Sequence, residues 1–419
     1  MGNQFKVDRR VFLKGTAAGA STAAIASMFP FVAEAADEIA VGGIHDESGF
    51  LDIAGQPMSQ VLRFAVAEKN KAGGLLGKQI KLYDYDSQSN MQLYSQYAQQ
   101  LALKDKASVV FGGITSASRE VIRPVLRRYK TLYFYDTLYE GGVCDRNQFA
   151  TGTTPAQTVE KLVPFVMKKW GGKKIYTLAA DYNYGQITAD WVKKYVRENG
   201  GEILATDYFP LDVTNFGPTI SKVQEAKPDI LISVLVGSAH LAFYRQWAAA
   251  GMMKQIPIAA TTFGAGGNEV VLMDPSESDG MINALGYFQE IETPENTKWK
   301  ADLKAFFGDK MPLLTELSCC TYEGFQFWTK AVEMAGTLDR MKVIEALETG
   351  MSIDGPSGKV TIEPKTHHTI RNVYVAEIND RKWQVLETYD QVPPQDTMAV
   401  CDLEKNPDDT TMYVIKLDE

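Results

Sequence analysis

The chain has 419 residues, of which 45% are hydrophobic and 23% charged, and 52 acidic residues against 43 basic ones give a net charge of −9. This composition is typical of a folded globular protein long enough for two lobes, and it excludes a disordered or fibrous chain. An acidic chain without basic clusters is also poorly suited to bind nucleic acid or an anionic membrane surface.

The first 35 residues have the pattern of an export signal. The pair Arg9-Arg10 is followed by a mildly apolar run over residues 15–32 and by Ala33-Glu34-Ala35, which fits an A-x-A cleavage site. The arginine pair before Phe-Leu-Lys resembles a twin-arginine signal. We expect residues 1–35 to be removed near Ala35 and the mature chain to be periplasmic. No later apolar stretch approaches the ~20 residues that span a bilayer, so we expect no membrane insertion.

Beyond the signal, short β-rich runs alternate with amphipathic helical stretches. This alternation predicts parallel βαβ units. In the first series we expect strands over residues 39–44, 79–86, 108–113 and 131–136, and helices over residues 57–71, 91–104 and 116–129.

A second series repeats this rhythm. We expect helices over residues 158–170, 184–199, 216–226 and 238–250, and strands over residues 174–180, 203–210, 229–237 and 256–262. The last third adds a strand (281–288), helices (295–307, 314–335 and 341–348) and a hairpin of residues 355–364 and 371–378.

Two doubly wound α/β lobes are the simplest account of this pattern. The pieces of the last third complete both lobes, so the chain must cross between them more than once, as in hinged proteins that close around ligands. We assign residues 36–155 and 286–350 to lobe 1, and residues 156–285 and 351–419 to lobe 2.

The cysteines and histidines show no metal-ligand spacing. Four cysteines allow three complete disulfide pairings, and the sequence does not select one. The pair Cys319-Cys320 lies in an expected helix, where we predict small buried residues. The pair His367-His368 lies in an expected turn, and we interpret it as a solvated loop.

In open α/β sheets, ligands bind beyond the carboxyl ends of the strands. This rule selects four loops, at residues 45–49, 113–118, 136–140 and 181–185. Ser116 is a candidate N-cap for the helix that starts near Ala117, and the same hydroxyl could contact a ligand.

Tyrosines follow two of the expected strands. The period of two along residues 131–136 places Phe134 in the core and Tyr135 at the open end of the strand, where we expect ligand contact. Tyr182 and Tyr184 share a face if their loop is extended, and they would close the site from the second lobe. Tyrosine supplies a flat apolar wall and one hydroxyl, which suits a small molecule with a planar polar head.

Several motifs resemble the substrate-binding proteins of urea and short-chain amide ABC transporters: TSASR (115–119), YEG (139–141), DYNYG (181–185) and DGPSGKVTIEPKTHHT (354–369). These belong to the type I periplasmic binding proteins, which also include binders of branched-chain amino acids. The resemblance implies two Rossmann-like lobes joined by three hinge crossovers. It also implies a small-molecule ligand between the lobes, no cofactor, and an inner-membrane ABC permease as partner.

The resemblance transfers ligand contacts to Ser116, Tyr135, Thr137 and Tyr184, and less strongly to Tyr182. Tyr139 and Glu140 match a family signature that can be structural and need not contact the ligand. The complete set of candidate ligand-binding residues is Asp46, Ile114, Thr115, Ser116, Tyr135, Asp136, Thr137, Tyr182 and Tyr184.

This sequence departs from the family pattern at four positions. Asp136 stands where relatives often have proline, and Asp46 stands where they usually have a neutral residue. Gly185 stands where relatives tend to have proline, and Ile114 lies near a position that is usually aromatic. Two carboxylates at the crevice would disfavour an anionic ligand and favour a cationic one. Alternatively, Asp136 caps local backbone and never faces the ligand.

Three functions fit these features. The first is a solute-binding protein for urea, a short amide or a related nitrogen compound, with a cationic compound or a branched-chain amino acid as alternative cargo. The second is an exported enzyme, against which stands the lack of a GxSxG motif or a Cys–His arrangement. The third is a cytoplasmic ligand sensor, against which stands the export signal.

Overall fold

The computed structural model describes residues 38–267 and 269–415, so the predicted signal peptide lies outside the described residues. Within these two ranges, no helix is both long and apolar enough to cross a membrane.

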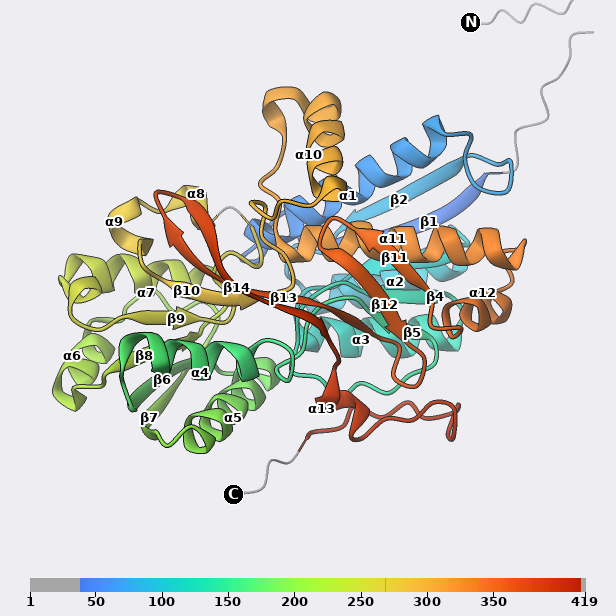
Figure 1. The fold of residues 1–419 in the computed structure, drawn as a ribbon. Coiled ribbons are helices and arrows are strands. Elements are labelled where there is room, and N and C mark those ends of the chain that lie inside the picture. The colour runs from blue at the N-terminus through green and yellow to red at the C-terminus, as the bar shows by residue number, and fades with distance from the viewer. Residues whose placement is uncertain (1–37, 268, 416–419) are drawn as a thin grey trace, which may run out of the picture. The chain divides into compact units, whose positions relative to one another are not determined.

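The first series forms a parallel sheet in the order β2-β1-β3-β4-β5 (Figure 1). Its strands alternate with helices as predicted, and apolar residues fill the inner strands β3 and β4. The elements are β1 (Ile39–His45), α1 (Asp52–Lys71), β2 (Ile80–Asp86), α2 (Met91–Leu103), β3 (Val109–Gly112), α3 (Ser116–Arg128), β4 (Leu132–Tyr135) and β5 (Gln148–Ala150).

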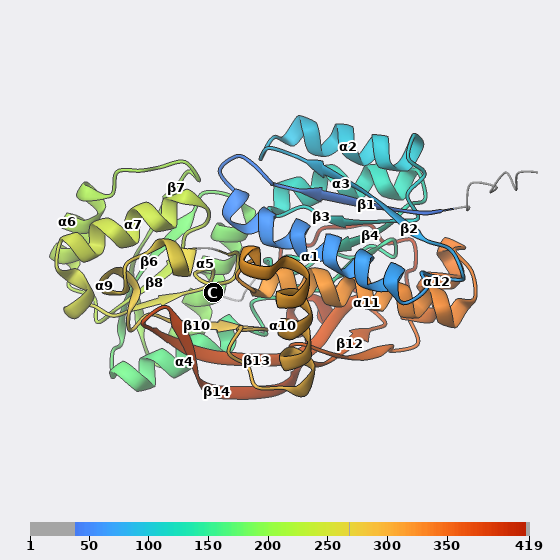
Figure 2. The same ribbon diagram turned by 90° about the horizontal axis from the view of Figure 1, so that it is seen from above.

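Helices cover both faces of this sheet, as the doubly wound prediction requires. Figure 2 shows α2 and α3 on one face and α1 on the other, where it packs beside α11 (Glu316–Ala335). Phe134 points into the core under α1 and α11, whereas Tyr133 and Tyr135 point into the core under α2 and α3. The predicted alternation along this strand is therefore confirmed.

The second series forms another parallel sheet in the order β7-β6-β8-β9-β10. The helix α4 ends at Trp170, and its C-cap is Gly171, whose φ of 68° is the left-handed conformation that glycine adopts without strain. The elements are α4 (Val159–Trp170), β6 (Lys174–Ala180), α5 (Asn183–Glu198), β7 (Glu202–Phe209), α6 (Gly217–Ala226), β8 (Ile230–Val234), α7 (Ser238–Ala249), β9 (Ile258–Ala260), α8 (Glu269–Leu272), α9 (Pro275–Ser278) and β10 (Ile282–Leu285).

The last third supplies the elements that link both sheets. The predicted hairpin is confirmed, since β12 and β13 pair antiparallel. The strand β13 also pairs with β5 at one end and with β10 further along. These elements are α10 (Pro294–Phe307), α12 (Arg340–Leu347), β11 (Ser352–Gly355), β12 (Gly358–Glu363), β13 (His368–Asn379), β14 (Lys382–Val392) and α13 (Gln395–Met398).

The chain passes between the two series after β5, after β10 and along β13, which agrees with three crossovers. The lobe boundaries stay a prediction. However, the strand pairing places β11 and β12 with the first series, although we assign residues 351–419 to lobe 2 from sequence.

The prediction of a solvated loop at His367-His368 is wrong. Both side chains are buried, because His367 stacks on Phe149 with ring centroids 4.1 Å apart and His368 hydrogen-bonds Tyr139. Burial lowers the pKa of His368 to about 3, so this ring is neutral at physiological pH.

The cysteines divide into a pair and two thiols. Cys144 and Cys401 form a disulfide that joins positions 257 residues apart in the sequence. Cys319 and Cys320 are free and buried in α11, which confirms their predicted role as small core residues.

Candidate functional site

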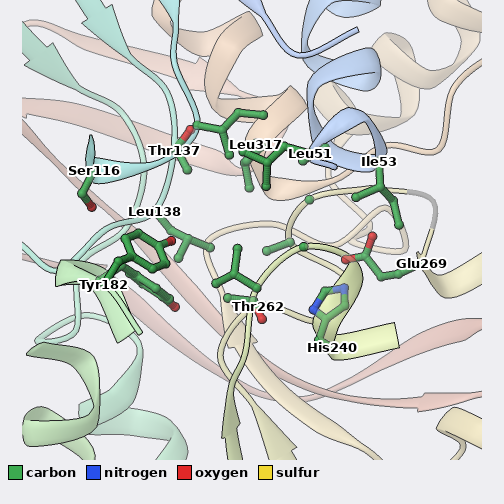
Figure 3. Close-up of a pocket in the computed structure, with 17 residues that line it drawn as sticks. Leu51, Ile53, Ser116, Thr137, Leu138, Tyr182, His240, Thr262, Glu269 and Leu317 are labelled. Carbon is green, nitrogen blue, oxygen red and sulfur yellow. The ribbon is translucent and has the colours of Figure 1, made fainter. Parts of the chain in front are cut away.

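A cavity lies where the carboxyl ends of strands from both series meet (Figure 3). Its empty volume is about 540 Å³, which includes space open to solvent. The loops or helix starts after β1, β3, β4, β6, β8 and β9 and the start of α11 line it: Leu51, Ile53, Ala54, Ile114, Ser116, Thr137, Leu138, Tyr182, Tyr184, Val236, Gly237, His240, Thr262, Ala265, Gly266, Glu269 and Leu317.

Two hydroxyls of the first series reach this cavity. Ser116 begins α3 and its hydroxyl donates to the buried carboxylate of Glu140. Thr137 follows β4 and donates to the carbonyl of Gly113 at 3.1 Å. Thr115, not Ser116, is the N-cap of α3, because its Oγ1 accepts the amide of Ser118 at 3.0 Å. The cap leaves the Ser116 side chain at the first helical position, among the cavity-lining residues.

A buried ion pair between Arg119 and Glu140 lies next to Ser116. Glu140, which accepts from Ser116, also accepts from Nη2 of Arg119 at 3.2 Å, and both ionic groups are fully buried. The Arg119 guanidinium lies over the ring of Tyr139 at 4.4 Å and over that of Tyr135 at 5.1 Å. Glu140 of the YEG motif thus fixes the position of the Ser116 hydroxyl, and Tyr139 of the same motif contacts Arg119.

Tyr182 and Tyr184 form the aromatic side contributed by the second series. Their ring centroids are 6.1 Å apart, with Tyr182 at the N-cap of α5 and Tyr184 in its first turn. The hydroxyl of Tyr184 hydrogen-bonds the hydroxyl of Thr261 at 2.9 Å. Gly185 permits this turn, because a Cβ there would meet the carbonyl oxygen of Ala180 at 1.9 Å.

The candidate residues from the sequence thus fall into two groups. Five of them line one cavity: Ile114, Ser116, Thr137, Tyr182 and Tyr184. The other four are not among the lining residues: Asp46, Thr115, Tyr135 and Asp136.

Each of these four has a partner in the protein. Tyr135 donates to the carbonyl of Ile114 at 2.7 Å, so it holds the loop after β3 in place and is not part of the cavity wall. Asp136 accepts from the hydroxyl of Thr151 at 2.7 Å, and Asp46 accepts from the hydroxyl of Tyr94. Burial raises the pKa of Asp136 to about 7 and also raises that of Asp46.

Sequence reasoning missed the part of the cavity built after β8 and β9. His240 lies in the first turn of α7, Thr262 follows β9, and Glu269 begins α8. The same rule on carboxyl strand ends, applied to the last two strands of the second series, would have selected the positions of His240 and Thr262, whereas Glu269 lies too far beyond β9 for it.

The lining is mainly apolar and carries a single carboxyl group, that of Glu269, with no lysine or arginine among its residues. Among the described residues, no group of three or more His, Cys, Asp or Glu side chains is arranged to hold a metal ion. The arrangement offers hydroxyls, aromatic rings and aliphatic walls, which are the means of binding a small molecule.

A doubly wound α/β fold with a cavity at the junction of two sheets defines a class of ligand-binding proteins. Residues 39–399 match the family described as periplasmic binding protein domain, and the chain belongs to this family. Members of the family are solute-binding components of ABC transporters.

Individual relatives are distant. The Leu/Ile/Val-binding protein homolog 6 of Brucella melitensis is 23% identical over 286 residues, which cover 67% of this chain and 72% of the relative. An amino acid ABC transporter substrate-binding protein of Pseudomonas fluorescens has a similar fold, with a TM-score of 0.78, 19% identity and coverage of 88% of this chain and 100% of that one. A solute-binding protein of R. palustris in complex with 4-hydroxybenzoate has a TM-score of 0.75 and 24% identity, and covers 85% and 98%.

Proposed function

We propose that this chain is a periplasmic solute-binding component of an ABC importer whose cargo is a short-chain amide or a related small nitrogen compound. The observation that carries the proposal is the cavity itself. The hydroxyls of Ser116 and Thr137 and the ring of Tyr182 lie together in one region of it (Figure 3), and the ring of Tyr184 lies beside that of Tyr182. A planar amide head can donate and accept hydrogen bonds there while it stacks on an aromatic ring.

The rest of the wall favours an aliphatic body on the ligand. Leu51, Ile53, Leu138, Val236 and Leu317 line the same cavity. Urea presents no apolar surface to these side chains, whereas each buried methylene of an aliphatic amide contributes about 0.8 kcal/mol. We therefore place propanamide and butanamide ahead of urea within this class.

A branched-chain amino acid is the second candidate, and the observation in its favour is the same aliphatic wall together with the names of the curated relatives. Its carboxylate would need donors from the hydroxyls and from backbone amides, because no lysine or arginine is among the described residues that line the cavity.

A thermal-shift screen of the purified protein tests this proposal. The compounds are urea, acetamide, propanamide, butanamide, leucine and 4-hydroxybenzoate. A ligand that binds only the folded state stabilises it by about 2.7 kcal/mol at a hundredfold excess over Kd. Compounds of the class that the protein binds will therefore raise its melting temperature. We expect butanamide to give a larger shift than urea, acetamide and propanamide. A shift with leucine and none with any amide would reject the amide proposal.

The variant Ser116→Ala locates the head of the ligand. Loss of one hydroxyl contact should weaken butanamide binding by about 0.5–1.5 kcal/mol. Ser221→Ala is the matched control, because Ser221 is exposed on α6 and donates only to the carbonyl of Gly217. Isothermal calorimetry on both variants gives the comparison. Equal affinities of the two variants would mean that Ser116 does not touch the ligand.

A further inference from the structure

Two ionisable side chains line the cavity in the region that sequence reasoning did not select. His240 on α7 is 4% exposed and Glu269 at the start of α8 is fully buried. Both stand on the same side of the cavity in Figure 3. Neither belongs to the hydroxyl and aromatic region near Ser116, which lies on the opposite side of the same view.

Both side chains have polar atoms without a hydrogen-bond partner in the protein. Oε1 of Glu269 accepts the amide of Gly264 at 2.7 Å, but Oε2 has no partner in hydrogen-bond geometry, although the amides of Gly266 and Gly267 lie near enough to lower the pKa of this carboxyl. Neither ring nitrogen of His240 has one. The carbonyl of Leu235 lies near enough to His240 to affect its pKa, yet it is not in hydrogen-bond geometry and accepts from Thr262 at 2.5 Å instead.

Such a cluster is costly unless something else completes it. Each buried polar group without a partner costs about 1–3 kcal/mol, and more when it is charged. Glu269 and His240 both line the cavity, so a ligand in the cavity could reach these unpartnered atoms. A ligand with hydrogen-bond donors would satisfy the free carboxylate oxygen and a lone pair of the neutral imidazole together.

We propose that Glu269 and His240 form a subsite for a cationic nitrogen group, an ammonium or amidinium, at the end of the ligand remote from Ser116. This rests on the proposed function for the other end of the cavity. The ligand would then have a polar head near Ser116 and Tyr182, an aliphatic middle beside Leu138 and Leu317, and a cation at Glu269. Among the described residues that line the cavity, Glu269 carries the only carboxyl group and none is lysine or arginine, so Glu269 sets the charge of this lining.

The titration of the two groups agrees with this assignment. Burial raises the pKa of Glu269 to about 7, against the effect of the amides of Gly264, Gly266 and Gly267. Burial lowers the pKa of His240 to about 4, so the imidazole is neutral and can accept a hydrogen bond. The free protein therefore holds Glu269 partly protonated, and a bound cation would favour its ionised form.

Other ionisable groups on the elements around Glu269 are engaged elsewhere or are neutral. On α7, Tyr244 donates to Ser233 at 2.8 Å and Arg245 donates to the carbonyl of Leu272 at 2.9 Å. At the start of α11, Glu316 accepts from Thr153. Burial raises the pKa values of Tyr184 and Tyr182 well above their usual range, so both phenols stay neutral.

Matched probes test the subsite by calorimetry at pH 7. They are 4-aminobutanamide, which carries the added ammonium, butanamide, which lacks it, and 1-aminobutane, which lacks the amide head. The wild-type protein should bind 4-aminobutanamide about tenfold or more tightly than butanamide, since a charge-assisted hydrogen bond is gained. Glu269→Gln should abolish this preference, because the amide that replaces the carboxylate has no charge to pair with the ammonium.

Asp136→Asn is the matched control variant. Asp136 is another buried carboxyl whose pKa burial raises to about 7, but it does not line the cavity. Removing this carboxyl should keep the preference for 4-aminobutanamide within about twofold, because effects at separate sites are nearly additive. If Asp136→Asn removes the preference and Glu269→Gln does not, the cation lies at Asp136 and our assignment is wrong.

Proton release on the wild-type protein gives a readout that needs no variant. Binding of 4-aminobutanamide at pH 7 should release about half a proton, seen as a dependence of the heat on the ionisation enthalpy of the buffer. Affinity should rise between about pH 6 and pH 8, because protonated Glu269 must first lose its proton. Butanamide should release none, and equal release with both probes would overturn the proposal.

The outcomes separate the two proposals. If neither amide binds but 1-aminobutane stabilises the wild-type protein and not Glu269→Gln, the amide proposal fails and the cationic subsite stands. If butanamide binds as tightly as 4-aminobutanamide, the cationic subsite is wrong and the amide proposal stands. If no amine-bearing probe binds, the cationic subsite is also wrong.

Discussion

Replacing Arg371 by methionine should lower the free energy of unfolding by about 3–5 kcal/mol, the range for breaking a buried ion pair by removal of one partner. Arg371 lies on β13 and is fully buried with Glu323 of α11, its Nη2 donating to Oε2 at 2.8 Å. The same guanidinium donates to the carbonyl of Thr151 at 2.5 Å and to the hydroxyl of Ser357 at 2.8 Å. Methionine would remove these hydrogen bonds and leave Glu323 as a buried charge without its cation.

Lys298→Met is the matched control, because it removes a cation from an exposed ion pair instead of a buried one. Lys298 pairs with Asp302 on the surface of α10, with side chains 74% and 40% exposed. Its loss should change the stability by at most about 0.5 kcal/mol, as for exposed helix pairs. Urea denaturation of both variants gives the comparison. Equal losses would show that the Arg371 network contributes no more than an exposed pair.

Removing the disulfide should lower the stability by about 2–5 kcal/mol. The bond between Cys144 and Cys401 closes a loop of 257 residues, which restricts the unfolded chain, and both cysteines are buried in a small apolar cluster with Leu403. The chain end after β14 therefore stays attached beside the loop that follows β4. A double variant, Cys144→Ser with Cys401→Ser, removes the bond without leaving a thiol at either of these two positions.

Thermal unfolding with and without dithiothreitol checks this prediction. The reductant should lower the melting temperature of the wild-type protein toward that of the double serine variant, which should itself show no response. The free thiols Cys319 and Cys320 are present in both proteins, so they act as an internal control. A wild-type melting temperature that the reductant does not change, although thiol titration shows reduction, would contradict the expected contribution.

Most of the fold could be predicted because local patterns and global packing agree. The strand β6 has the same limits as its predicted range, since apolar residues fill it and Gly171-Gly172 ends the helix before it. The start of α1 could not be predicted. We expect the helix to begin at Pro57, a residue that favours the first turn, but it begins at Asp52 and keeps Pro57 inside. Residues 53 and 54 then reach the cavity.

The candidate site could be predicted where strand ends and motifs coincide. Ser116, Thr137 and Tyr184 follow three different strands, and all line the cavity. The orientation of a turn carboxylate could not be predicted, because period two does not extend past the end of a strand. Asp136 therefore looked like a ligand contact, whereas it accepts from Thr151 inside the protein. Glu269 follows β9 by nine residues, so no local pattern connects it to the cavity.

A crystal structure of the protein with the tightest-binding amide from the screen tests the central claim most directly. Our account predicts ligand density inside the cavity between the two series of strands, with the amide head within hydrogen-bond distance of Ser116 or Thr137 and beside the ring of Tyr182 or Tyr184. Density elsewhere on the molecule, with this cavity unchanged, would contradict the account.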